Sequence, residues 1–110
     1  MAKDILWLGD TKEAVSAYPK AVREDLGHQL GLIQDGDEPD DWKPLATVGG
    51  GVLELRLHHE NEYRVPYVAK CAEGIYVLHA FVKKTQRTTQ KDLRLAAQRY
   101  SDLIKSRKQR

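Results

Sequence analysis

Two short segments, residues 52–58 and 63–69, constrain the fold more than any other feature of the sequence. In each of them apolar and polar residues alternate, which is the period of a strand with one buried face. Pairing residue 58 with residue 62 leaves a three-residue loop and puts the apolar side chains of both segments on one face. A shift of one residue would put them on opposite faces, so the sequence predicts this register. The facing pairs are Leu57 with Tyr63, Leu55 with Val65, and Leu53 with Tyr67.

The polar face of this predicted hairpin carries two arginines opposite each other. Arg56 faces Arg64, and like charges placed directly across a strand pair cost stability. One interpretation is that the pair binds phosphate. The other is an ion pair with Glu54, which is next along the same face. Pro66 has no N–H and lies in the middle of the second segment, which predicts an edge strand or a bulge at this position.

Residues 75–83 are apolar on both faces, which predicts a central strand that is covered on both sides. The strand ends in Lys83 and Lys84, which point to opposite faces, and Arg87 follows in a polar loop. One of the lysines would join the two arginines of the hairpin in a phosphate site that needs no metal. The alternative is a strand end with ordinary surface lysines.

The rest of the chain predicts one more strand and three helices. Residues 5–8 form an apolar strand, and Thr11 caps a helix that runs to about Tyr18. Pro19 suits the first turn of a second helix, and residues 89–92 resemble a capping box that opens the last one. The apolar stripes of the two longer helices are Val22, Leu26, Leu30 and Ile33, and Leu93, Ala96, Ala97, Tyr100 and Ile104.

Glycines mark the connections between these elements. Gly36 ends the second helix, and residues 37–50 are predicted to be a loop that leads into a flexible stretch of three glycines. Gly27 and Gly31 weaken the second helix, but they would permit close packing against a neighbour. The predicted order is β-α-α-β-β-β-α, an α+β fold with one curved, mainly antiparallel sheet packed against helices. The 110 residues are expected to form a single domain.

The net charge of +2 conceals two halves of opposite sign. Residues 1–50 hold 5 Lys/Arg and 10 Asp/Glu, residues 51–110 hold 13 and 6, and residues 83–110 alone hold 10 and 2. A basic block attracts phosphates where it lies on one surface, whereas the alternative is a solvated helix with spare cations. The block makes Arg87, Lys91, Arg94 and Arg99 candidate RNA-binding residues.

What the sequence lacks excludes several classes of protein. No apolar run is long enough to span a membrane, and the first ten residues do not resemble a secretory signal. The single cysteine, Cys71, fits a reducing cytoplasm. No zinc spacing, phosphate loop or nucleotide-binding glycine pattern occurs, so no metal or cofactor is predicted. His58 and His59 point apart on a strand, whereas His79 is predicted to be a hydrogen-bonded core residue.

Three segments carry a more specific pattern. They are residues 42–45 (Trp-Lys-Pro-Leu), the hairpin strands 51–56 and 63–65, and residues 77–86, which end in Phe-x-Lys-Lys-Thr-Gln. Together they resemble the RelE/HigB superfamily of toxins, most closely its phage-type HigB-like branch. The resemblance implies a RelE-like fold and a metal-independent endoribonuclease that cleaves messenger RNA on the ribosome. Carried over to this sequence, the catalytic positions are Arg56, Arg64, Lys83 and Lys84.

The resemblance also implies a partner, a small antitoxin with a DNA-binding helix-turn-helix. It would bind either the basic sheet face or the first two helices, where Gly27 and Gly31 favour a close approach. Two other functions fit the sequence: a ParE-type inhibitor of DNA gyrase, which needs a binding surface but no catalytic cations, and an inactive nucleic-acid-binding relative. The paired arginines and the two adjacent lysines favour RNA cleavage over gyrase inhibition, whereas the inactive relative stays an alternative.

Overall fold

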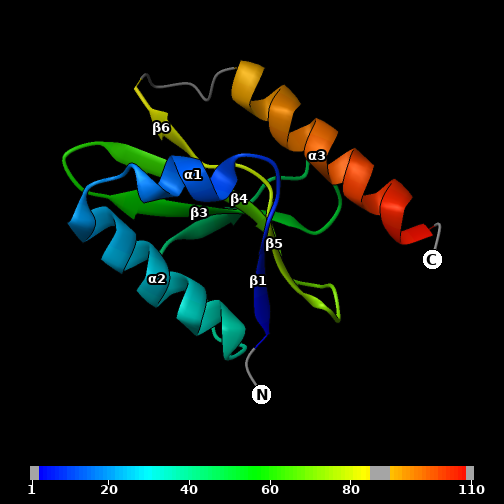
Figure 1. Ribbon diagram of the computed structural model, residues 1–110, viewed down its shortest axis with the longest axis horizontal. Helices are drawn as coiled ribbons and strands as arrows, with labels where there is room; N and C mark the ends of the chain where they lie inside the picture. The colour runs from blue at the N-terminus through cyan, green and yellow to red at the C-terminus, as the bar shows by residue number, and fades with distance from the viewer. Residues whose placement is uncertain (1–2, 85–89, 109–110) are drawn as a thin grey trace.

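The computed structural model describes residues 3–84 and 90–108. This part of the chain has an α+β fold, as the sequence predicts, with three helices and six strands (Figure 1). The order of elements differs from the predicted one because there are two more strands than expected. The strands are β1 (Asp4–Trp7), β2 (Trp42–Pro44), β3 (Val52–His58), β4 (Glu62–Val68), β5 (Gly74–Val77) and β6 (Phe81–Lys83), and the helices are α1 (Thr11–Ser16), α2 (Lys20–Gln34) and α3 (Gln90–Lys108).

The strands form one open, mostly antiparallel sheet. Its order is β1-β5-β4-β3-β2, and β6 pairs with β4 along the first half of that strand. Strand β1 runs parallel to β5, and the other pairs are antiparallel. The predicted register of the hairpin is confirmed, since Leu55 pairs with Val65 and Arg56 with Arg64. The two arginines therefore share the face opposite the leucines of β3.

Helices cover both faces of the sheet (Figure 1). On one face, α2 packs its buried apolar stripe against Leu55 and Val65. On the other face, α3 packs Ala96 and Leu103 against Val52. Each fully buried aliphatic side chain of this kind stabilises the fold by roughly 1.5–3 kcal/mol. Beyond Val52 along β3, the face that carries α3 turns from apolar to charged.

The third predicted strand, residues 75–83, is in fact two strands. Strand β5 ends at Val77 and β6 begins at Phe81, and the three residues between them oppose only two residues of β4. This extra residue makes a bulge opposite Pro66. The carbonyl of Pro66 accepts a hydrogen bond from Leu78 N at 2.9 Å, but proline has no N–H to donate to the same side. The prediction of a bulge at Pro66 is thus confirmed, although β4 is an inner strand.

Residues 37–50, predicted to be a loop, contain the edge strand β2. Trp42 pairs with Leu55, and Lys43 pairs with Glu54. Three residues are too few to show the alternation from which a strand is predicted, so this strand owes its formation to pairing with β3. The pairing gives Glu54 a cationic neighbour that the predicted loop did not provide.

The helix ends follow the sequence in part. Gly36 has a φ of 87° and follows Asp35, the C-cap of α2, as predicted for the residue that ends this helix. The prediction that Thr11 caps α1 is wrong, because the N-cap is Asp10. Thr11 is instead completely buried, and its hydroxyl donates a hydrogen bond to the carbonyl of Leu8.

The glycines have surroundings different from those predicted. Nothing in the described chain lies within 4 Å of the Cβ position at Gly27 or Gly31, so neither serves close packing inside this protein. The glycine loop before β3 is not a free connection, because Tyr100 Oη and Lys70 Nζ each donate a hydrogen bond of 2.7 Å to the carbonyl of Gly50. Helix α3 and the end of β4 thereby hold this loop in place.

Gly49→Ala is expected to destabilise the protein by about 1–3 kcal/mol. A Cβ atom at Gly49 would lie 2.3 Å from Cε2 of Tyr100, so the ring and its hydrogen bond to the loop would have to move. Gly50→Ala is the matched control, because nothing lies within 4 Å of its Cβ position. Urea unfolding of the two variants measures the difference, and equal free energies of unfolding would show that Tyr100 does not hold the loop.

Candidate functional site

Four charged side chains meet on the sheet face that also carries α3. Lys43 lies on β2, Glu54 and Arg56 lie on β3, and Arg64 lies on β4. Residues directly opposite each other in a sheet have their side chains on the same face. Because Lys43 pairs with Glu54 and Arg56 pairs with Arg64, all four side chains point to one side. We call these residues the Glu54 cluster.

Glu54 lies at the centre of the cluster. Its Oε1 is 3.6 Å from Nε of Arg56, 3.6 Å from Nε of Arg64 and 3.9 Å from Nζ of Lys43. The Glu54 side chain is 1% exposed, and neither carboxylate oxygen has a hydrogen bond within residues 3–84 and 90–108. Glu54 is therefore the acidic partner that offsets the repulsion between the two arginines, as the second interpretation of the sequence requires.

The three cations of the cluster differ in their exposure to solvent. The Arg64 side chain is 5% exposed, its Nη1 donates to the preceding backbone carbonyl at 3.3 Å, and its Nη2 lies 3.5 Å from Glu62. The side chain of Arg56 is 27% exposed and that of Lys43 is 44% exposed. Arg56 and Lys43 thus present their charge to solvent, whereas Arg64 adds its charge from beneath the surface.

His58 extends the charged surface along β3. Its Nε2 lies 2.5 Å from Asp41 and its Nδ1 lies 2.7 Å from Glu62, and a ring that donates from both nitrogens is the charged imidazolium. The hydrogen bond to Asp41, followed by that to Glu62, raises the pKa of His58, and the hydrogen bond from His58 lowers the pKa of Glu62. Glu62 also contacts Arg64, so charged groups run without a break from Asp41 to the Glu54 cluster. The sequence interpretation of His58 went no further than rejecting it, with His59, as a pair of metal ligands, and it missed the place of His58 beside Arg56.

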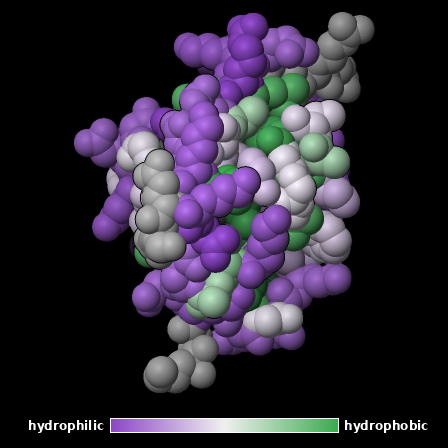
Figure 2. All heavy atoms as spheres, turned by 90° about the vertical axis from the view of Figure 1, so that its right-hand side faces the viewer, coloured by the Kyte–Doolittle hydropathy of each residue, from purple (hydrophilic) through white to green (hydrophobic). Residues whose placement is uncertain are grey.

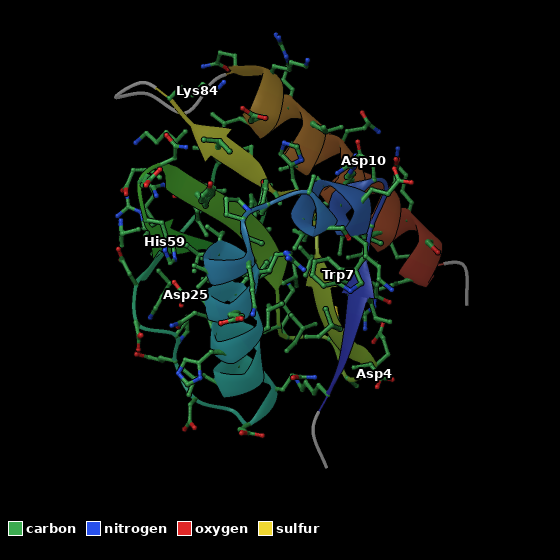
Figure 3. All side chains as sticks on the ribbon, turned by 60° about the vertical axis from the view of Figure 1, so that its left-hand side comes forward. Asp4, Trp7, Asp10, Asp25, His59 and Lys84 are labelled. Carbon is green, nitrogen blue, oxygen red and sulfur yellow. The ribbon has the colours of Figure 1, made fainter. Side chains whose placement is uncertain are left out.

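The other histidines follow the sequence interpretation. His59 points away from its neighbour and pairs with Asp25 of α2 at 2.9 Å (Figure 3). His79 is buried, its Nε2 lies 2.8 Å from Asp92, and its ring stacks on Phe81 with 5.3 Å between centroids. The prediction that His79 is a hydrogen-bonded core residue is confirmed. Its contact with Asp92 attaches the first turn of α3 to the bulge between β5 and β6.

The two adjacent lysines lie at one end of the charged surface. Lys83 pairs with Glu62 across the β6–β4 ladder, which places its side chain on the face of Arg64. Lys84 is exposed beyond the end of β6, at the end of the molecule where α3 begins (Figure 3). Arg87, the third cation predicted here, lies outside the described residues.

A comparison with protein families bears on this site. The family model described as "Phage derived protein Gp49-like (DUF891)" matches residues 13–101. The chain belongs to this Gp49-like family. The match contains the strands β2 to β6 and therefore the whole Glu54 cluster. A search of curated proteins found no match.

The Gp49-like family belongs to the RelE/HigB-like toxin group, so the resemblance seen in the sequence is confirmed at that level. The family is compatible with a toxin of a toxin–antitoxin system, and toxins of this kind have an antitoxin partner. In the parts of the Gp49-like chain that the structure describes, no helix is both long and apolar enough to cross a membrane. Nor do three His, Cys, Asp or Glu side chains converge there to hold a metal ion.

The predicted RNA-binding residues of α3 have different surroundings. Lys91 and Arg94 are exposed in the first half of the helix. Arg99 is 15% exposed, donates to the carbonyl of Leu78 at 2.9 Å and pairs with Asp10 at 2.7 Å, which lowers the pKa of Asp10. Figure 3 shows Asp10 beside α3. Lys91 and Arg94 are therefore accessible from solvent, whereas Arg99 attaches α3 to the bulge and to the turn before α1.

The C-terminal half of α3 is attached by a second ion pair. The side of the molecule that carries the helix is largely hydrophilic, with hydrophobic side chains visible in the gaps (Figure 2). Arg107 donates to Glu73 from Nε at 2.9 Å and from Nη2 at 3.2 Å, and the hydroxyl of Tyr76 donates to the same carboxylate at 2.8 Å. The hydrogen bonds from Arg107, then from the backbone and Tyr76, lower the pKa of Glu73 to about 2.

This ion pair is expected to loosen the end of α3 as the pH falls below about 4.5. Because the pKa of Glu73 is lower in the folded chain than its ordinary value of 4.5, the pair stabilises fully above that pH and is lost as the pH approaches 2. Hydrogen exchange of the amides in the last turns of α3, measured across this range, is expected to show protection that falls in wild type. Glu73→Gln should remove this dependence on pH, whereas Asp102→Asn on the exposed side of α3 should keep it. A Glu73→Gln profile identical to that of wild type would contradict the prediction.

Proposed function

We propose that this chain is the toxin of a type II toxin–antitoxin pair and a metal-independent endoribonuclease that cleaves messenger RNA on the ribosome. The observation that carries the proposal is the Glu54 cluster, where Arg56 reaches solvent above the buried guanidinium of Arg64. Membership of the Gp49-like family supports the role as a toxin. On this proposal the protein acts in the cytoplasm, where messages are translated.

The proposed reaction uses the 2′-hydroxyl of the RNA as its nucleophile. The 2′-oxygen attacks the adjacent phosphorus, the bond from phosphorus to the 5′-oxygen breaks, and a 2′,3′-cyclic phosphate and a 5′-hydroxyl result. One proton leaves the 2′-oxygen and one reaches the 5′-oxygen, so the reaction consumes neither metal nor cofactor. The protein has to supply positive charge at the phosphate and groups that transfer protons.

The charged residues divide these tasks according to their exposure. Arg56 would bind a non-bridging phosphate oxygen and offset the charge that builds up on it. Arg64 would strengthen that effect from beneath, since its side chain is 5% exposed. Lys83 or Lys84, at the end of the same surface, would transfer the protons. Lys91 and Arg94 would extend the RNA-binding surface along α3.

Induction of the protein in bacteria, followed by mapping of RNA ends, tests the proposal. We expect growth arrest together with new 5′-hydroxyl ends inside translated messages. Growth arrest with intact transcripts would contradict the ribonuclease function. A DNA gyrase supercoiling assay then separates the alternatives, because inhibition without RNA breaks would identify a ParE-type toxin, and the absence of both effects would identify an inactive relative.

The antitoxin is expected to carry a helix-turn-helix and to dock on the outer faces of α1 and α2. Gly27 is exposed, and the space around the Cβ positions of Gly27 and Gly31 is open for 4 Å, so a partner helix can approach closely. Residues 1–50 hold 5 Lys/Arg and 10 Asp/Glu. Within this half, helices α1 and α2 balance three Lys/Arg against three Asp/Glu, so their faces lack the excess of positive charge that attracts RNA and are available to a protein partner.

Gly27→Lys is expected to weaken antitoxin binding by about tenfold or more, equivalent to ~1.4 kcal/mol. The toxin itself should fold normally, because the position is open and lysine favours a helix over glycine. Arg56→Glu is the matched variant, expected to abolish RNA cleavage and to leave antitoxin binding intact. Isothermal titration calorimetry measures both. If Arg56→Glu loses binding and Gly27→Lys retains it, the antitoxin covers the Glu54 cluster instead.

A further inference from the structure

Glu54 is buried without the hydrogen bonds that a buried carboxylate ordinarily makes. Both of its oxygens are shielded from solvent, and its three cationic neighbours lie 3.6–3.9 Å away, beyond hydrogen-bond distance. Burying a charge in this state costs stability. An apolar side chain would avoid that cost, and Val52 and Val68 on the same face belong to an apolar core. Glu54 offsets the repulsion between Arg56 and Arg64, but apolar side chains at both position 54 and position 64 would serve the fold without either buried charge, so stability alone does not account for a glutamate here.

The contacts of Glu54 orient its neighbours. The Nε of Arg56 faces the carboxylate and is buried, although 27% of the side chain is exposed. Within the described residues, the terminal nitrogens of Arg56 form no hydrogen bond. Unlike Nε, they are not buried, so they face solvent. The Nζ of Lys43 approaches the same carboxylate oxygen from β2, and its side chain is 44% exposed. One buried oxygen thus holds two solvent-facing cations from adjacent strands.

We propose that Glu54 is a positioning residue that holds Lys43 and Arg56 as a pair, and that this pair binds the phosphodiester of RNA. The inference rests on the proposed ribonuclease function and assigns the substrate phosphate to two named side chains. A planar guanidinium binds two phosphate oxygens at once, and an ammonium beside it adds a compact positive charge. Lys43 can belong to the pair because strand β2 places it beside β3. Glu54 can position both cations because its carboxylate is buried beside them.

The first experiment measures the binding of a 2′-O-methyl oligoribonucleotide, which cannot be cleaved because its nucleophile is blocked. Fluorescence anisotropy over a series of salt concentrations gives the slope of log affinity against log salt. We expect Lys43→Met to reduce this slope by about 0.7, the value for one phosphate contact on a single strand. Lys20→Met is the matched control, since Lys20 is 82% exposed on α2. An unchanged slope in Lys43→Met, or an equal change in both variants, would overturn the proposal.

The second experiment separates positioning from simple repulsion of RNA. Glu54→Gln keeps the shape of the side chain and removes its negative charge. If Glu54 only repelled RNA, the variant would bind more tightly and cleave at least as fast as wild type. Positioning predicts an unchanged or lower KM together with a kcat reduced by about tenfold or more, because the reacting phosphate is held less accurately. Glu54→Asp, which keeps the charge, should recover part of the lost kcat.

Thermal unfolding of the same samples excludes a merely structural role. A structural role would lower the Tm of Glu54→Gln and leave the kcat of its folded fraction unchanged. An unchanged kcat in this variant would therefore overturn the proposal. If Glu54→Gln does not fold, the comparison of Lys43→Met with Lys20→Met alone decides. Failure of the wild-type protein to bind the oligomer also overturns the inference.

The inference and the proposed function fail separately. Intact transcripts in cells that express the wild-type protein contradict the ribonuclease function, whatever the behaviour of Lys43. Cleaved transcripts, together with a Lys43→Met variant that binds and cleaves like wild type, overturn only the pairing of Lys43 with Arg56.

Discussion

Arg56→Met is expected to slow RNA cleavage by about 10²–10³-fold at saturating substrate. Within the described chain, Arg56 is the guanidinium of the Glu54 cluster that reaches solvent, with 27% of its side chain exposed. Its charge lies where negative charge would build up on the phosphate, so the loss should fall on kcat more than on KM. Single-turnover cleavage of a message on purified ribosomes gives the rate.

Two further variants make this result interpretable. Arg56→Lys keeps the charge but loses the planar fork that binds two oxygens, so it should recover only part of the rate. Arg23→Met removes an exposed arginine from α2, on the other face of the sheet, and should cleave like wild type. A wild-type rate for Arg56→Met would place the phosphate site elsewhere on the protein.

Arg64→Met is expected to destabilise the folded protein by about 3–5 kcal/mol. The Arg64 side chain is 5% exposed beside a Glu54 side chain that is 1% exposed. Removing Arg64 leaves the buried carboxylate of Glu54 with only Lys43 and Arg56 as cationic neighbours, and both of these are more exposed to solvent. A loss of this size is a large fraction of the stability of a typical small domain, and urea unfolding will measure it.

The double variant Glu54→Leu, Arg64→Met identifies the cause of that loss. It removes both buried charges and replaces them with apolar side chains, so it should recover most of the lost free energy of unfolding. A double variant no more stable than Arg64→Met would attribute the loss to packing rather than to the carboxylate. Cleavage measured at a matched folded fraction then separates the part that Arg64 plays in catalysis from its part in the fold.

Some elements of the fold could be predicted to the residue and others could not. The register of β3 and β4 follows from the sequence because a shift of one residue would turn Leu55 and Val65 out of the core. Strand β2 has only three residues and is visible only through its pairing with β3. The break between β5 and β6 is hidden because Leu78 and Ala80 are as buried as in a continuous strand, and its cause lies on β4.

The candidate site divides in the same way. The opposition of Arg56 and Arg64 follows from the register, and Glu54 is identified as a possible acidic partner by its place on the same face. The choice between phosphate binding and an internal ion pair depends on how deeply each side chain is buried. The alternation of apolar and polar residues along a strand does not report that depth. In the structure both arginines lie 3.6 Å from Glu54, so the ion-pair interpretation is confirmed, and the 27% exposure of Arg56 leaves phosphate binding a prediction. Lys43 could not be assigned without β2.

A proline on β4 helps to determine where α3 lies on the sheet. Pro66 offers no N–H to the neighbouring strand, so the chain leaves the ladder there, and the carbonyl of Leu78 turns towards Arg99 while His79 reaches Asp92. Both contacts belong to α3, so the bulge anchors the helix together with Asp10, Gly50 and Glu73. A continuous strand would carry neither anchor in this position, and the first half of α3 would lose two of the contacts that hold it. An uncharged imino acid buried in a neighbouring strand therefore helps to fix the helix that carries Lys91 and Arg94.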